Sequence, residues 1–214
     1  AQMESVSGKK PFVKYWLHTG FLNVEGKKMS KSLGNVFNIR DIIKDYDSKL
    51  IRYFFIANHY RMPIDFSKKI LEQYKNSLQR INDLIIKLRN SKEKDNIRLI
   101  KKTKDDFIKA MDDDFDTPRA FSVIFDFVRK INKNGGGKKT LKFMKEIDSI
   151  FNILNFEEDK LEKELIKLIE KRELARKNKD YKTADRIRLE LKNKGIILED
   201  TKDGVRWKKI NLLL

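Results

Sequence analysis

The sequence predicts a mainly α-helical protein in which an antiparallel helical bundle is followed by a small mixed α/β module. Apolar residues recur every three or four positions over most of residues 39–154, the spacing that places side chains on one face of a helix. Residues that cap helices, notably Ser67 and Asp180, stand at predicted helix starts. Near the C-terminal end, two β-prone segments flank Asp203-Gly204, a pair typical of hairpin turns.

The first part of the chain predicts strand and loop. The segment that begins at Ala1 has neither an initiator Met nor a helix cap, so we expect the chain to start inside a longer fold. Residues 12–24 are apolar and β-prone, and Glu25-Gly26 is a turn signal. Residues 27–35 are polar and predict a loop.

Helices are predicted over the rest of the chain, several from an apolar stripe, most of them from a capping residue, and one, over 160–178, as a charged helix. Their expected ranges are 39–45, 49–58, 68–90, 96–111, 118–133, 138–154, 160–178 and 181–194. The expected caps are Asn38 with Asp41, Ser48, Ser67, Asp116 or Thr117, and Asp180. Breaks are expected at Pro63 and at Gly135 to Gly137, and Lys104 interrupts one apolar stripe. Strands are expected at 196–199 and 205–208.

Composition favours a partner that carries negative charge. Lys and Arg number 49 against 32 Asp and Glu, which gives a net charge of +17. A basic surface attracts phosphates and releases their counterions, so we expect nucleic acid, although a Lys-rich solvated surface is the alternative. The chain has no Cys, two His and no long apolar run. We therefore expect a cytoplasmic protein without a disulfide, a His/Cys metal site or a membrane-spanning segment.

The most specific segment is the octet Lys28-Met29-Ser30-Lys31-Ser32-Leu33-Gly34-Asn35. Two lysines and several hydroxyl groups on a flexible loop suit phosphate chemistry, because negative charge builds up on the phosphate oxygens during transfer. The Gly and Lys frame of a Walker loop is absent. The alternative is an ordinary solvated loop.

The octet resembles the Lys-Met-Ser-Lys-Ser loop of class I aminoacyl-tRNA synthetases. Within that class, further segments are similar to cysteinyl-tRNA synthetase, in the same order along nearly all of the chain. These segments are residues 8–23, 52–55, 59–67, 113–120, 184–188 and 195–201, with Trp207 at the end. The chain thus resembles the C-terminal half of this family.

The resemblance implies a three-part chain. Residues 1–45 would be the end of a Rossmann-type catalytic domain, residues 46–156 a helical bundle that binds tRNA, and residues 157–214 an anticodon-binding α/β module. The family activates cysteine with ATP and Mg²⁺ and transfers it to tRNA-Cys. Lys31 matches the family's catalytic lysine, and the ATP-binding positions match Lys28, Met29, Ser30, Lys31 and Ser32.

Other parts of the family pattern do not occur in this chain. The His-Ile-Gly-His motif of the class is missing, and so are the Cys ligands of the family's zinc. We therefore expect a missing N-terminal half to hold the zinc, no metal in this chain, and no cysteine activation by this chain alone.

The expected tRNA contacts lie mostly near the C-terminal end. They are Arg61, Arg186, Arg188, Glu199, Asp200, Arg206 and Trp207. Trp207, between two cations, could stack on an unpaired base or pack on helix 181–194. Glu199 and Asp200 could accept hydrogen bonds from a cytosine amino group or cap a turn.

Three groups of titratable residues receive a structural interpretation. We expect His18 and His59 to be packed beside aromatic side chains. Asp112 to Asp114 are expected to cap a helix, because no carboxylate spacing completes a metal site.

Three other functions remain open. The chain could be a non-catalytic tRNA-binding module, or a helical protein–protein adaptor. It could also be a relative that joins cysteine to an amino sugar, although that relative lacks the anticodon module.

Overall fold

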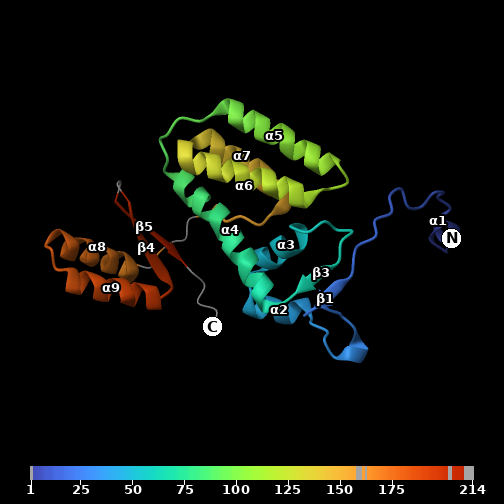
Figure 1. The fold of residues 1–214 in the computed structure, drawn as a ribbon, viewed down its shortest axis with the longest axis horizontal. Helices are drawn as coiled ribbons and strands as arrows, with labels where there is room; N and C mark the ends of the chain where they lie inside the picture. Colours follow the sequence, from blue (N-terminus) through green and yellow to red (C-terminus); the bar gives the residue numbers. More distant parts are fainter. Residues whose placement is uncertain (1, 158–160, 162, 202–203, 210–214) are drawn as a thin grey trace. The chain divides into compact units, whose positions relative to one another are not determined.

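The computed structural model describes residues 2–157, 161, 163–201 and 204–209. The chain divides into two units, Ala1–Phe156 and Glu157–Leu214. Helices dominate both units (Figure 1), which confirms the mainly helical fold class. In the described part of the chain, no helix is both long and apolar enough to cross a membrane.

The first unit begins with a short helix and a small sheet. Their bounds are α1 (Gln2–Ser7), β1 (Leu22–Val24), β2 (Lys27–Lys28) and β3 (Ile64–Phe66). The strand order is β2-β1-β3, with β1 antiparallel to β2 and parallel to β3. Sequence analysis predicted neither α1 nor β3. The strand expected over 12–24 is confined to 22–24, because only these residues find a partner strand.

The polar segment 27–35 is more ordered than a loop. It contains β2 and the 3-10 helix η1 (Lys31–Leu33). The turn before β2 is formed by Glu25 and Gly26, both with positive φ, and the Gly26 amide donates to Asp65 Oδ1 at 2.8 Å. The hairpin is therefore tied to β3.

Six helices complete the first unit. Their bounds are α2 (Ile39–Asp45), α3 (Ser48–Ile56), α4 (Lys68–Arg89), α5 (Ile97–Asp112), α6 (Thr117–Asn134) and α7 (Lys138–Phe151). Helices α5, α6 and α7 lie together, and the long α4 runs from them to α3 and the sheet (Figure 1). Leu71, Ile85, Ile131 and Met144 are among the buried residues of the common core.

The residues observed at the starts of the helices can be compared with the predicted caps. Ser67 Oγ accepts from the Ile70 amide and Asp116 Oδ1 from the Arg119 amide, as predicted. Asn38 is the N-cap residue of α2, as predicted, but the capping box is wrong, because the Asn38 side chain makes no capping hydrogen bond and Asp41 pairs with Lys44 instead.

The Ser48 cap is also wrong. The carboxylate one residue earlier, on Asp47, accepts from the Lys49 amide at 2.7 Å, and Ser48 is already helical. The charged acceptor caps the helix one position before the expected hydroxyl.

An acidic side chain from the α4–α5 connection fixes the start of α7. Asp95 accepts hydrogen bonds from the amides of Gly137, Lys139 and Thr140 and from the Thr140 hydroxyl, at 2.7 to 3.1 Å. Burial would raise the pKa of Asp95, but these hydrogen bonds outweigh it and lower the pKa. Gly135, with φ 84°, ends α6 at the predicted break.

The second unit contains α8 (Lys163–Lys177), α9 (Tyr181–Asn193), β4 (Ile196–Thr201) and β5 (Gly204–Lys209). The two strands are antiparallel and pair Leu198 with Trp207. Asp180 caps α9 through the Thr183 amide, as predicted. Ile187, Leu191 and Ile196 are buried in its core. Both strands are longer than predicted, because the hairpin pairing continues to Thr201 and Gly204. The Asp203 of the predicted turn lies outside the described residues.

Candidate functional site

The octet is held by its own backbone and by one asparagine. The Met29 amide donates to Leu22 O at 3.0 Å, which fixes the octet to β1. Asn35 closes it, because its Oδ1 accepts from the Ser30 amide at 2.9 Å and its Nδ2 donates to Lys28 O at 3.3 Å. Gly34 adopts φ 64°, a left-handed conformation that glycine accepts without strain. The segment is thus a shaped loop.

The two lysines of the octet differ in their surroundings. Lys28 Nζ lies 4.1 Å from the ring centroid of Phe21. Lys31 is exposed, and its side chain has no hydrogen-bond or ion-pair partner among the described residues. Ser30 and Ser32 lie beside it, with their hydroxyl oxygens 3.2 Å apart. Chemically, Lys31 and the two hydroxyls can meet an anionic ligand without first breaking an ion pair.

Met29 has a different environment from its charged neighbours. It lines a cavity of about 820 Å³, together with Leu22, Val24 and Phe66 of the sheet. An apolar side chain in such a place anchors the loop to the sheet. The ATP-binding role predicted for Met29 therefore remains a prediction that its side-chain environment does not favour.

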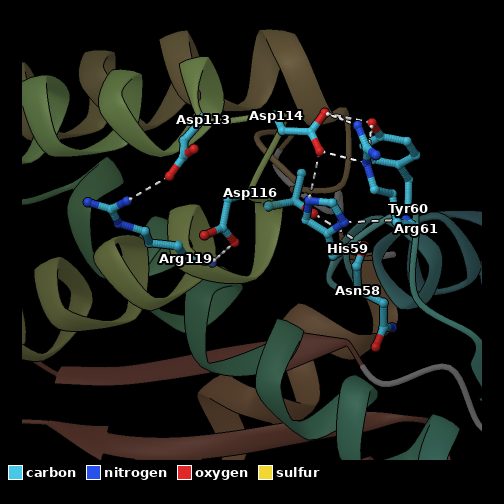
Figure 2. Close-up of polar contacts among 9 residues, drawn as sticks. Asn58, His59, Tyr60, Arg61, Asp113, Asp114, Asp116 and Arg119 are labelled. Carbon is cyan, nitrogen blue, oxygen red and sulfur yellow. Dashed lines mark hydrogen bonds and ion pairs between the residues drawn. The ribbon is translucent and has the colours of Figure 1, made fainter. Parts of the chain in front are cut away.

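Arg61 lies in a polar cluster in the first unit (Figure 2). Its guanidinium pairs with Asp114 at 2.7 Å, and this contact, first of all its hydrogen bond, raises the pKa of Arg61. The capping role expected for Asp114 is wrong, because its carboxylate binds Tyr60 and Arg61, which lie far earlier in the sequence. The residue that caps α6 is Asp116.

The two histidines differ. His59 is half-buried and stacks on Tyr60, with ring centroids 4.9 Å apart. His18 stacks on Trp16 but is exposed, so the packed environment expected for it is wrong. The aromatic side chains beside it, Tyr15 and Trp16, are themselves 83% and 75% exposed and do not enclose the His18 ring.

In the second unit, Asp200 is held by two arginines of α8. Its Oδ1 accepts from Arg172 Nη1 at 2.6 Å and its Oδ2 from Arg172 Nη2 at 3.0 Å, and Arg176 Nη1 forms an ion pair with Oδ1 at 2.6 Å. The hydrogen bonds from Arg172 lower the pKa of Asp200. Arg172 is only 3% exposed. Asp200 is therefore part of a structural ion pair. A base that bound Asp200 would have to share its carboxylate with the two arginines.

The other predicted tRNA contacts are spread over α9 and the hairpin. Arg186 is exposed, and Arg188 Nη2 donates to Leu198 O at 3.4 Å. Trp207 is half-buried and packs against the core of the second unit. The backbones of Glu199 and Arg206 pair in the hairpin, but their side chains lie outside the described residues.

Sequence analysis did not single out Tyr181, nor the two arginines, Arg172 and Arg176, that bind Asp200. Tyr181, the first residue of α9, is 60% exposed, the more exposed of the two described aromatic side chains in this unit. The available signal was its place directly after the Asp180 cap, beside the apolar stripe of α9 and not within it.

Three family models match successive parts of the chain. Residues 1–77 match the family described as tRNA synthetases class I (C) catalytic domain. Residues 106–156 match the DALR domain, and residues 158–207 match the cysteinyl-tRNA ligase anticodon binding domain. Domains of this kind, in this order, define a class I aminoacyl-tRNA synthetase.

Curated relatives narrow the class further. The chain is 42% identical to a cysteine–tRNA ligase of Bacillus licheniformis, over 98% of this chain and 48% of the relative. Identity is 41% to the Clostridioides difficile ligase, over 98% and 49%. It is 40% to that of Lactococcus lactis subsp. cremoris, over 97% and 46%. The chain belongs to the cysteinyl-tRNA synthetase family and spans about half the length of these relatives.

One solved structure is also similar to part of the chain. It is the Agrobacterium radiobacter K84 LeuRS in a ternary complex with tRNA and LeuAMS. The match covers 55% of this chain and 17% of that one, with a TM-score of 0.42 and 17% identity.

Proposed function

We propose that this chain supplies the ATP loop and the tRNA-binding surfaces of a cysteine–tRNA ligase, which activates cysteine with ATP and charges tRNA-Cys. One observation carries the catalytic part of the proposal. The octet is shaped by Asn35 and Gly34, and it presents an exposed Lys31, which has no ion-pair partner in the described part of the chain, beside two hydroxyl groups.

In this proposal Lys31 acts in the transition state of cysteine activation. Negative charge grows on the phosphate oxygens as pyrophosphate leaves, and an exposed ammonium group can follow and stabilise that charge. Ser30 and Ser32 donate hydrogen bonds to the same oxygens, and Lys28 adds positive charge. Mg²⁺ would accompany ATP, while the protein's own contribution here is cationic and hydroxylic.

The zinc of the family does not fit the residues of this chain. The sequence has no Cys. Within the described residues, no group of three His, Cys, Asp or Glu side chains could hold a metal ion. We propose that selection of cysteine, and the other half of the adenylate site, depend on residues that precede this chain in the relatives.

The parts of the chain divide the work. We propose that residues 1–45 contribute to the catalytic domain, residues 46–156 contact tRNA as a helical bundle, and residues 157–214 read the anticodon. The match of 158–207 to an anticodon-binding domain argues against the amino-sugar ligase, which lacks that module.

The test of the catalytic role is Lys31→Ala in a protein completed with the N-terminal half of a relative. The turnover number of cysteine-dependent ATP–pyrophosphate exchange should fall by about 10² to 10³, because a transition-state contact is lost. Michaelis constants for ATP and cysteine should change little. Lys27→Ala, which removes another exposed lysine just before the octet, is the matched control. A loss confined to the Michaelis constants would make Lys31 a ground-state binder.

The chain without that half should perform no exchange above a no-enzyme blank. One loop cannot position both reactants. Turnover by the purified chain would refute this expectation.

We further propose that Tyr181 and Trp207 take part in anticodon binding, with most of the affinity supplied by basic side chains. Affinity for tRNA should fall steeply as salt rises. A ring that stacks on an unpaired base contributes about 1–3 kcal/mol, so Tyr181→Ala should cost that much affinity without lowering the melting temperature. Trp207→Ala should lower both, because Trp207 also packs on the core.

Two results would contradict this assignment. The first is equal binding of tRNAs that carry the G-C-A anticodon and a scrambled one. The second is unchanged affinity per folded molecule in both aromatic variants. Either result would mean that the basic side chains bind tRNA without recognising its anticodon.

A further inference from the structure

The corner between α5 and α6 reaches back to a loop far earlier in the chain. Asp114 Oδ1 accepts from the Tyr60 hydroxyl at 2.6 Å and from Arg61 Nη2 at 3.1 Å. Its Oδ2 forms an ion pair with Arg61 Nε at 2.7 Å, and His59 Nε2 lies 3.8 Å from the same oxygen. One carboxylate thus contacts three consecutive side chains of the loop between α3 and β3.

The backbone of this corner is strained in a way that aims the carboxylate. Asp114 and Phe115 have φ of 52° and 54°. Two consecutive left-handed residues that both carry a Cβ are unfavourable, and Phe is a poor residue for this conformation. The Phe115 ring is exposed, so burial does not offset the strain. Figure 2 shows that Asp114 points to Tyr60 and Arg61 and that Asp113 points to Arg119.

The loop that Asp114 contacts is packed tightly on Gly20, two residues before β1. Tyr60 O accepts from the Gly20 amide at 2.8 Å. Gly20 leaves no space for a side chain, because a Cβ there would lie 2.2 Å from Met62 O. Two residues further on, Leu22 O accepts from the Met29 amide of the octet. A continuous set of contacts therefore leads from Asp114 to the octet.

We propose that Asp114 is a positioning residue for the octet. Its bonds to Tyr60 and Arg61 hold the 59–62 loop against Gly20, and this contact sets β1 and the octet in place relative to the helical bundle. Asp114 does not touch the reacting atoms. Its effect on catalysis rests on the function proposed above, whereas its effect on the order of residues 19–30 does not.

Hydrogen exchange of this chain tests the structural part. Asp114→Asn suits the strained corner, because Asn tolerates a left-handed backbone, and it removes the charge that holds Arg61. Exchange of the Gly20 and Met29 amides should become about fivefold faster, as expected for the loss of an exposed ion pair and its hydrogen bonds. Amides of α6 and α7 should exchange at the original rate.

Two further variants sharpen this result. Asp113→Asn removes the neighbouring carboxylate, which pairs with Arg119 and not with the 59–62 loop. The exchange rates of the Gly20 and Met29 amides should therefore stay unchanged. Tyr60→Phe keeps the ring against His59 and removes one hydroxyl donor, so exchange should rise by about twofold. Equal rates in the Asp114 and Asp113 variants would overturn the proposal. An equal rise in α6 and α7 would also overturn it, since Asp114 would then support the whole unit.

Kinetics of the completed protein test the catalytic part. Asp114→Asn should lower the turnover number of cysteine activation about tenfold, with the Michaelis constant for cysteine within about twofold. In a Lys31→Ala background the same substitution should cause little further loss, because the lysine that it positions is gone. An equal fold reduction of the turnover number in both backgrounds would show that Asp114 acts independently of Lys31 and would overturn the proposal. If the unmodified completed protein activates no cysteine, the proposed function fails, and the exchange data still decide whether Asp114 positions the loop.

Discussion

The helical bundle and residues 2–45 belong to the same unit but use their apolar side chains differently. Residues 46–156 bury many of their large apolar side chains almost completely, and Phe54 is only 1% exposed. Among residues 2–45, which the structure describes throughout, Val24 alone is buried, and Tyr15, Trp16 and Phe21 are exposed. The bundle closes its own core, whereas the region that carries the octet presents apolar surface. Exposed apolar patches of this kind mark interaction sites.

This difference leads us to expect two kinds of stability in one unit. Packing within the bundle should determine its melting temperature. The region around the octet should depend on bonds to the bundle, such as those of Asp114, and on whatever surface covers its aromatic side chains.

The largest expected effect is that of Phe54→Ala. The Phe54 ring makes edge contacts with Phe55, Phe66 and Tyr74. Its removal should lower the free energy of unfolding by about 3–5 kcal/mol, from lost burial and the cavity that remains. Phe12→Ala, the same substitution at a ring that is 40% exposed, is the matched control and should cost well under half as much. Similar losses in denaturant unfolding would mean that the two regions share one core.

The next effect comes from Asp95, which fixes the start of α7 within the bundle. Asp95→Asn should lower the free energy of unfolding by about 2 kcal/mol at neutral pH, because backbone amides lose a charged acceptor. The folded pKa of Asp95 is lowered, so its contribution is complete above the pKa of the unfolded chain, about 4, and is lost as pH falls through the folded pKa.

Denaturant unfolding of the Asp95 variant as a function of pH checks this sign. The difference between the two proteins should shrink on acidification below about pH 4. A difference that is constant from neutral to acidic pH would show that the charge of Asp95 contributes nothing.

Local features of the fold could be predicted from the sequence, because their cause lies within a few residues. Ser67, Asp116 and Asp180 cap the helices that begin beside them. The helix whose apolar stripe is interrupted at Lys104 also forms, because Thr103, Phe107 and Ala110 carry its buried face.

Features that depend on distant partners could not be predicted. The parallel pairing of Leu22 with Ile64 creates β3 from a segment with no strand signal of its own. Asp200 meets Arg172 only when the hairpin folds onto α8, so its sequence context indicated a contact with a base or a turn cap and not this ion pair. For the octet, the sequence predicted the residues, and the structure adds their support by Asn35 and the sheet.

The smallest expected effect concerns the two tryptophans, one in each unit. Trp16 is 75% exposed, so Trp16→Ala should change the free energy of unfolding by less than about 0.5 kcal/mol, as do most surface substitutions. Trp207→Phe leaves Trp16 as the remaining tryptophan, and its fluorescence should be quenched strongly by acrylamide. Trp16→Phe leaves the half-buried Trp207, which should be quenched less. In a protein completed with the N-terminal half, quenching of Trp16 should fall if that half covers the aromatic side chains of residues 2–45. Quenching of Trp16 that is as strong in the completed protein as in this chain would show that its surroundings remain open to solvent, and the exposed apolar surface would then need another partner.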